Sequence, residues 1–176
     1  MTDLRYPIGE FTWDGVMTDA RRAACVARIA AAPGLLRAAV AGLNDRQLDT
    51  PYRPAGWSVR QVVHHVPDSH LNAYTRMRLA LTEDTPTIKP YDEARWAELC
   101  DARSAPIGVS LALLDALHVR WVSLLRELGP TECARGVRHP EHGRVMSVDE
   151  LLALYAWHGE HHTAHVTALR TRMGWS

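Results

Sequence analysis

Residues 147–173 read SVDELLALYAWHGEHHTAHVTALRTRM, a long amphipathic segment. Ser147 and Glu150 form the pattern of a capping box, and Gly174 follows the last residue, as at ordinary helix ends. Apolar residues recur along one side of the segment at steps of three and four, which is the period of a helix. They are Val148, Leu151, Leu152, Tyr155, Val166 and Leu169. The stretch therefore predicts one long helix whose apolar side is buried against other helices.

Three further segments carry the same helical signals, and each is bounded by residues that start or stop helices. They run from Thr18 to Leu43, from Ser58 to Glu83, and from Ser104–Pro106 to Leu128. Pro33 and Pro67 fall inside the first two segments, where each removes a backbone hydrogen bond and predicts a kink. No alternating run rich in β-branched residues predicts a strand. We therefore expect an all-α chain that forms a single domain over residues 1–176, with the architecture of a four-helix bundle.

The segment Pro86–Cys100 is predicted to be a long connection that carries one short helix around Glu93–Leu99. Its run Tyr91-Asp92-Glu93 could reach the mouth of a pocket. A surface or capping role is nevertheless favoured for each of these three residues, because such roles are the commoner use of polar residues in connections.

Composition excludes several classes of protein. The 176 residues hold 20 Lys plus Arg against 20 Asp plus Glu, so the net charge is zero, and 47% are hydrophobic. This balance argues against nucleic-acid binding through a strong positive field, and the apolar content argues against disorder. No apolar run approaches the roughly 18 residues of a membrane span, and the first residues lack the apolar core of a signal peptide. With three widely spaced cysteines and no disulfide framework, a cytoplasmic location is expected.

Ten histidines are present, and four of them lie on the last predicted helix. Stepping about 100° per residue places His162 within roughly 10° of the centre of the apolar stripe and His158 roughly 50° away. His161 falls about 110° from that centre, near solvent, and His165 about 70° away, at a boundary. Glu160 lies opposite the stripe and is expected to be solvated. His158 and His162, one turn apart, are therefore the candidates that face the core.

Three more histidines lie on the second predicted helix. The apolar stripe there passes closest to His70, and Pro67 makes the helical phase unreliable beyond that point. The residues alone leave His65 and His70 both open as partners of the last helix. His64 is expected on a solvated face, and Asp68 could reach a pocket mouth.

Two readings of the inward-facing pair compete. A single histidine on an apolar face is usually a hydrogen-bonded core residue. Two imidazoles one turn apart in a bundle core lose hydration unless each finds a partner, and a shared metal ion satisfies both. A non-catalytic bundle that holds a structural metal or another cofactor is the alternative to an enzyme.

The sequence resembles the DinB-like four-helix-bundle superfamily, and within it the YfiT group, which is described as metal-dependent hydrolases. The superfamily cue is Trp57-Ser58 at the start of the second helix with His65 eight residues after the tryptophan, together with His158-x-x-x-His162 on the last helix. Narrower YfiT-like strings are Arg5–Gly9, Gly56–His65, Pro86–Glu93 and Tyr155–His162. They are spread over nearly the whole chain.

The resemblance implies a metal site made of His65, His158 and His162, with one zinc or nickel ion per subunit and often a homodimer. On the residues alone, His70, His161, His165 and Asp68 are further candidates for supporting these ligands or lining the pocket. Three neutral imidazoles leave a cation with an open position.

That position can activate water for hydrolysis of a small molecule, or a low-molecular-weight thiol for S-transfer, as in relatives that use bacillithiol or mycothiol. Thiol transfer is slightly favoured, because no strong general base accompanies the predicted ligands. The one apparent departure from the family pattern is Pro67, two residues after His65.

Overall fold

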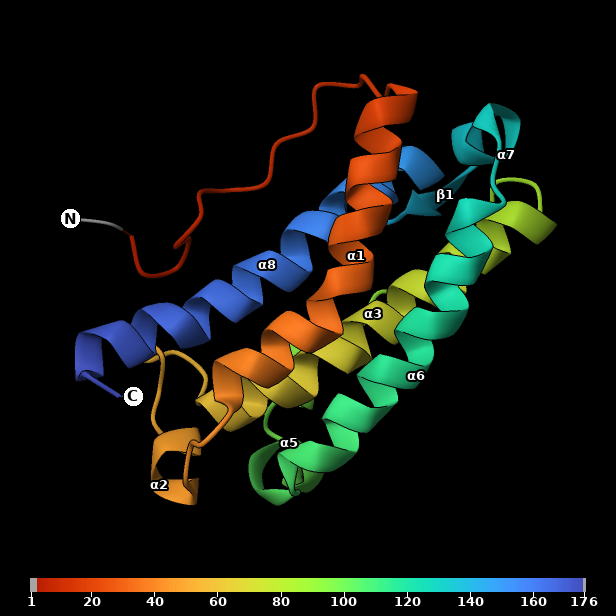
Figure 1. The fold of residues 1–176 in the computed structure, drawn as a ribbon. Helices are drawn as coiled ribbons and strands as arrows, with labels where there is room; N and C mark the ends of the chain where they lie inside the picture. The colour runs from red at the N-terminus through yellow and green to blue at the C-terminus, as the bar shows by residue number, and fades with distance from the viewer. Residues whose placement is uncertain (1–2, 176) are drawn as a thin grey trace.

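The computed structural model describes residues 3–175 and is a four-helix bundle, as predicted (Figure 1). Its long helices are α1 (Asp19–Val40), α3 (Val59–Thr82), α6 (Ile107–Arg126) and α8 (Val148–Met173). Short helices lie between them: α2 (Asp45–Leu48), α4 (Glu93–Trp96), α5 (Cys100–Ser104) and α7 (Pro130–Ala134). A two-stranded antiparallel hairpin, β1 (Gly136–His139) and β2 (Arg144–Ser147), leads into α8.

The helix starts follow from side-chain caps. The hydroxyl of Ser58 accepts from the backbone N–H of Gln61, and the Gln61 side chain accepts in return from the N–H of Ser58. At α8 only half of the predicted capping box forms. Ser147 accepts from the N–H of Glu150 at 3.1 Å, but the Glu150 carboxylate pairs with Arg144 at 2.7 Å instead. The hairpin causes this difference, because it brings the Arg144 guanidinium to the first turn of α8.

The two internal prolines do not interrupt their helices. α1 continues through Pro33 and changes direction about halfway along its length (Figure 1), so the predicted kink is present without a break. α3 continues through Pro67 without interruption from Val59 to Thr82. The pyrrolidine ring removes one N–H in each case, which leaves the carbonyl four residues earlier without its usual helical donor.

The core has two apolar clusters, one toward each end of the bundle. One cluster includes Ile29, Met77 and Trp121, and the other includes Leu36 and Leu114. Between these clusters, α3, α6 and α8 carry histidines, whereas α1 contributes none. A polar layer therefore crosses the middle of an otherwise apolar bundle.

Two of these helices are apolar along most of their length. α1 and α6 have the length and composition of membrane-crossing helices, which differs from the expectation that no apolar stretch approaches a membrane span. In this bundle α1 lies along α8 and α6 (Figure 1), and the residues of each that face the other helices are buried. Core helices of a bundle show the same composition.

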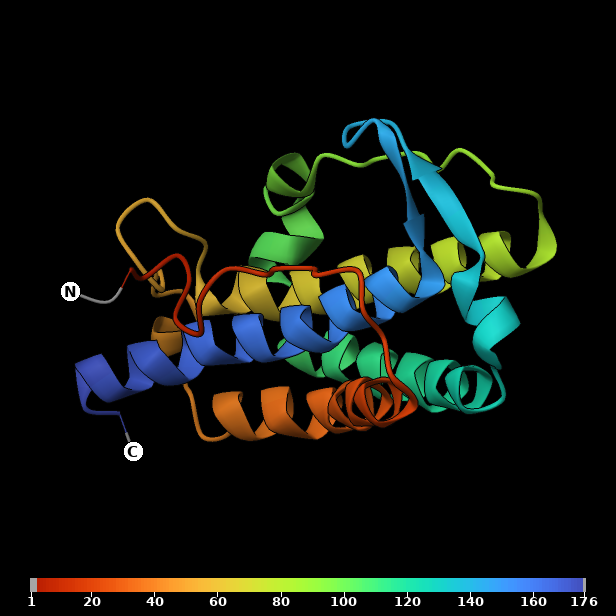
Figure 2. The ribbon, with the colours of Figure 1, turned by 90° about the horizontal axis from the view of Figure 1, so that it is seen from above.

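The hairpin was not predicted, because each strand is only four residues long and lacks a clear alternating pattern. It also binds the connection that follows α3. Ile88 donates to the carbonyl of Arg138 at 3.1 Å, and Arg138 donates to the carbonyl of Pro86 at 2.9 Å. Figure 2 shows the hairpin and this connection on the same side of the bundle. The hairpin thereby positions the segment that continues to Tyr91 and Glu93.

Gly136 in β1 allows the two strands to approach closely. A Cβ atom there would lie 2.5 Å from the carbonyl oxygen of Met146 and 2.8 Å from Cγ1 of Val145. We expect Gly136→Ala to lower the free energy of unfolding by about 1–3 kcal/mol, because the hairpin has to shift. Gly34→Ala in α1 is the matched control: its Cβ meets nothing within 4 Å, and the helix gains about 0.5–1 kcal/mol. Urea unfolding measures both, and equal effects would contradict the close strand contact.

Candidate metal centre

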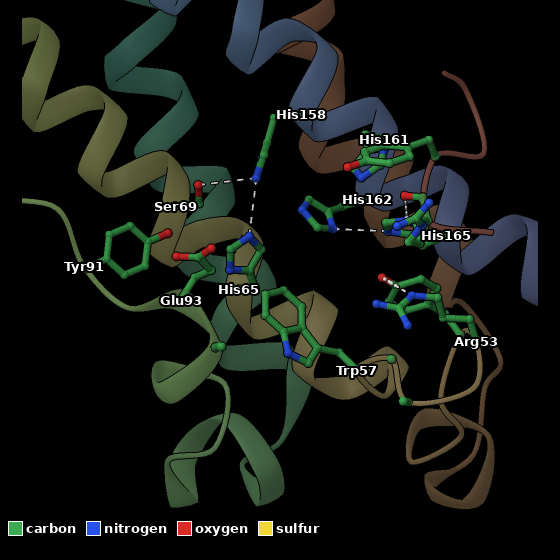
Figure 3. Close-up of a pocket in the computed structure, with 16 residues that line it drawn as sticks. Arg53, Trp57, His65, Ser69, Tyr91, Glu93, His158, His161, His162 and His165 are labelled. Atoms are coloured by element: carbon green, nitrogen blue, oxygen red, sulfur yellow. Dashed lines mark hydrogen bonds between the residues drawn. The ribbon is translucent and has the colours of Figure 1, made fainter. Parts of the chain in front are cut away.

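A cavity of about 560 Å³ lies beside the middle of α3 and α8 (Figure 3). Its lining residues come from five segments that are far apart in the sequence. They are Arg5 and Tyr6, the loop residues Tyr52, Arg53, Ala55, Gly56 and Trp57, His65 and Ser69 of α3, Tyr91, Glu93 and Ala94, and His158, His161, His162 and His165 of α8. The four long helices alone therefore do not make this cavity, because loops and the N-terminal segment complete it.

The structure brings His65 of α3 together with His158 and His162 of α8. One ring nitrogen of each lies within 4.8 Å of the others. The Nε2 atoms of His65 and His158 are 3.4 Å apart. Two nitrogens each about 2.0–2.1 Å from a tetrahedral zinc ion would be about 3.4 Å apart. The spacing of these imidazoles therefore fits one divalent cation.

All three imidazoles are held in the neutral form that binds a metal. Burial, with a smaller contribution from neighbouring histidines, lowers the pKa of His65 to about 4. Burial likewise places the pKa values of His158 and His162 well below the ordinary value for histidine, again with help from nearby imidazoles. Their lone pairs are therefore available at neutral pH without release of a proton.

His70 points into the bundle interior and does not line the cavity. It is completely buried, and both ring nitrogens are used: Nε2 lies 3.1 Å from Nδ1 of His158, and Nδ1 lies 2.8 Å from Nε2 of His118. Of the two histidines left open on α3, the structure therefore brings His65 to the cavity and places His70 behind His158. His118 of α6 was not singled out from the sequence, because it stands alone between apolar residues.

The predicted position of His161 near solvent is wrong, and His165, predicted at a boundary, is fully covered. Their exposed fractions are 6% and 3%. The N-terminal segment covers them: the ring of Tyr6 lies 5.9 Å from that of His161, and the carbonyl of Arg5 accepts from Nε2 of His165 at 2.9 Å. The apolar stripe of α8 indicates only the face that packs against other helices. It could not indicate that the N-terminal segment covers a second face of α8. His161, His162 and His165 also bring ring nitrogens within 4.8 Å of one another.

Two further exposures differ from the prediction, and one candidate lies apart from the cavity. His64 is buried rather than solvated, since its ring bonds to the Ser110 hydroxyl and to the Ala105 carbonyl. Glu160 pairs with Arg28 of α1 at 2.6 Å and is only partly exposed. Asp68 is half-buried and does not line the cavity, and burial raises the pKa of its carboxyl to about 6. In each case α1, α5 or α6 covers a face that one helix alone would leave open.

Tyr91 and Glu93 line the cavity, where a surface or capping role had been expected. Of their run only Asp92 caps a helix, accepting from the N–H of Arg95 at 3.0 Å. Figure 3 shows Ser69, Tyr91 and Glu93 pointing into the cavity on the side opposite His161 and His165. Burial raises the pKa of Tyr91 to about 12, so its phenol keeps its proton. The shared string Pro86–Glu93 was the one sequence signal that could have indicated them.

The family model of the DinB superfamily matches residues 28–166, so the chain belongs to this superfamily. A protein of Bacillus mycoides named "Putative metal-dependent hydrolase" is 52% identical over 175 residues, covering 99% of this chain and all of that protein. A protein of Oceanobacillus iheyensis with the same name is 52% identical over 171 residues, covering 97% of this chain and 98% of its own.

One solved structure is also similar over its full length. YfiT from Bacillus subtilis, described as "a probable metal-dependent hydrolase with an unusual four-helix bundle topology", matches with a TM-score of 0.97 and 47% identity. The match covers 99% of this chain and 100% of YfiT. The resemblance to the YfiT group expected from the motifs is therefore confirmed.

The buried histidines predict a pH dependence of stability in the metal-free protein. Burial lowers the pKa of His65 and of His161 to about 4, whereas an unfolded chain protonates histidine near 6.5. Stability is therefore full above about pH 6.5 and falls as the pH drops toward 4, by about 1.4 kcal/mol per histidine and pH unit. Urea unfolding at about pH 7.5 and pH 5.5 measures the loss. Equal free energies of unfolding at the two pH values would contradict neutral burial.

Proposed function

We propose that this chain is a metal-dependent hydrolase of small molecules in which His65, His158 and His162 hold a zinc or nickel ion. The observation that carries the proposal is the convergence of three neutral imidazoles within 4.8 Å on a cavity that also contains the carboxylate of Glu93. This cavity argues against a purely structural site, because a structural zinc ion is enclosed by four protein ligands and has no position open to a cavity.

The chemistry divides between the cation and the side chains around it. A divalent cation held by three imidazoles would supply Lewis acidity at a position open to the cavity, where water or a thiol loses its proton more readily. We assign the Glu93 carboxylate, which lines the same cavity, to accept the proton of the attacking water and to return it to the leaving group. The Tyr91 phenol, with a pKa of about 12, can donate a hydrogen bond to the substrate oxygen that gains negative charge.

Transfer of a small thiol is the second candidate, and one feature of the cavity favours it. The guanidinium of Arg53 donates to the Tyr52 hydroxyl at 3.3 Å and to the Pro54 carbonyl at 3.0 Å. No carboxylate of the described residues 3–175 forms a salt bridge with it, so it can attract an anionic group that enters the cavity. An anionic low-molecular-weight thiol would meet this requirement. The presence of Glu93 removes the reason for preferring transfer, which was the lack of a general base.

Metal content tests the site. Purified protein incubated with zinc or nickel is expected to retain about one ion per chain, and His162→Ala is expected to retain almost none while its circular dichroism stays helical. His64→Ala, a buried histidine of α3 outside the cavity, is the control and keeps the metal. Wild-type protein that takes up neither cation would refute the proposal. A large loss of thermal stability in His162→Ala that added metal does not restore would favour the non-catalytic alternative.

Glu93→Gln tests the proposed general base. We expect kcat to fall about 10²- to 10⁴-fold with unchanged metal content, because only proton transfer is lost. The substrates are a panel of p-nitrophenyl esters and p-nitroanilides, and a second panel offers a small electrophile together with cysteine, bacillithiol or mycothiol. Products formed with water indicate hydrolysis, and products that keep the thiol indicate transfer. A variant as active as wild type on every substrate turned over would exclude Glu93 as the base.

A further inference from the structure

A backbone carbonyl inside α1 has an unusual partner. Pro33 has no N–H, so the carbonyl of Ile29, four residues earlier, lacks its helical donor. This carbonyl lies 2.7 Å from Nδ1 of His118, on α6. A carbonyl oxygen can only accept a hydrogen bond, so Nδ1 of His118 carries the hydrogen.

The position of the hydrogen on His118 determines the positions of the hydrogens on the next two imidazoles. His118 is buried, and its two ring nitrogens are taken up by the Ile29 carbonyl and by His70, neither of which offsets a positive charge, so the ring carries a single hydrogen. Its Nε2 is therefore bare and accepts from Nδ1 of His70 at 2.8 Å. His70 is completely buried and both of its ring nitrogens face other imidazoles, so it too carries a single hydrogen, and its Nε2 accepts from Nδ1 of His158 at 3.1 Å. The remaining nitrogen, Nε2 of His158, is therefore a bare lone pair. It faces Nε2 of His65 at 3.4 Å, at the candidate metal position.

A shorter chain of the same kind reaches His162. The carbonyl of Arg5 accepts from Nε2 of His165 at 2.9 Å, which leaves Nδ1 of His165 bare. That nitrogen lies 3.4 Å from Nδ1 of His162, which is therefore the donor. Figure 3 shows the other nitrogen of His162 pointing toward the space between His65 and His158. Two of the three candidate ligands thus present Nε2 to the cavity because their Nδ1–H is bound on the opposite side.

We infer that the Ile29 and Arg5 carbonyls, acting through His118–His70 and through His165, fix the tautomers and ring orientations of His158 and His162. His70, His118 and His165 are then positioning residues of the metal centre. The role of these residues in metal binding rests on the proposed function, whereas the tautomers themselves do not, since the hydrogen-bond chains exist without a cation. Partners of this kind hold a ligand ring in its binding orientation and make it a better donor to the metal.

The chains also explain the second histidine group on α8. His161, His162 and His165 satisfy the spacing of a metal site. In the assigned tautomers Nδ1 of His162 carries a hydrogen, and Nε2 of His165 is bound to the Arg5 carbonyl. His165 serves as a support for His162, and a second cation would have to displace the hydrogen bond between them.

The first test reads the tautomers directly in metal-free protein. Long-range ¹H–¹⁵N correlation spectra of histidine-labelled protein near pH 7.5 separate protonated from bare ring nitrogens, and single His→Gln variants assign the rings. We expect hydrogen on Nδ1 of His118, His70, His158 and His162, and on Nε2 of His165. Hydrogen on Nε2 of His158 or of His162 would overturn the inference, whether or not the protein binds a metal.

The second test measures zinc affinity by competition with a chelator. His118→Phe removes both hydrogen bonds of the ring and is expected to weaken zinc binding about tenfold, the lower end of the range for such supports, because it acts through His70. His118→Gln has an N–H donor and an oxygen acceptor at similar spacing, so it should bind within about threefold of wild type. His64→Phe is the matched control, since it also removes a buried imidazole of the bundle with a backbone carbonyl partner.

The set of variants separates the possible failures. If His118→Phe and His118→Gln bind zinc as wild type does, the inference is wrong while the metal site stands. If His64→Phe loses as much affinity as His118→Phe, the effect is general destabilisation, and the inference is again wrong. If His118→Phe does not fold, the inference is still tested by the tautomers in the wild-type spectrum and by the zinc affinity of His118→Gln. A tenfold loss of zinc affinity in His118→Gln would also contradict the proposed chain of hydrogen bonds.

Discussion

The arrangement of the candidate metal centre depends on uncharged imidazoles that are buried between two apolar clusters. A protonated ring in the middle of the bundle would lose most of its hydration, so burial keeps His70, His158 and His162 neutral. A neutral ring still has one donor and one acceptor that need partners. The bundle meets this need with neighbouring imidazoles and with backbone carbonyls. The nitrogens left over converge on the cavity, where a cation would complete the set.

The pairing of α1 with α8 holds this layer in place. Gly159 lets the two helices approach, since a Cβ there would be 3.0 Å from that of Ala32. Arg22 and Arg28 of α1 bind Asp149 and Glu160 of α8 at 2.9 and 2.6 Å. These ion pairs lie at the two ends of the segment that precedes His161. The helix that carries two candidate ligands is therefore fixed against the helix whose proline frees a carbonyl for His118.

Segments outside the four long helices complete the cavity beside this layer. The N-terminal segment covers His161 and His165, and the connection held by the hairpin brings Tyr91 and Glu93 to the opposite wall. Both segments correspond to strings shared with the YfiT group, as do the stretches of α3 and α8 that carry the candidate ligands. The helices thus hold the candidate ligands, and the connections supply the groups that would handle protons and substrate.

Local signals in the sequence determined the four long helices, their start residues and the inward direction of His158 and His162, because helical period and caps depend on residues close together in the chain. They did not determine the hairpin, the burial of His64 and His161, the partner of Glu160, or the place of Glu93. The hydrogen bond between Arg5 and His165 spans 160 residues, and that between Ile29 and His118 spans 89. Only the tertiary structure decides such contacts. Coverage of a helix face and the tautomer of a buried ring depend on groups far away in the sequence, and helical periodicity relates only residues that are close together.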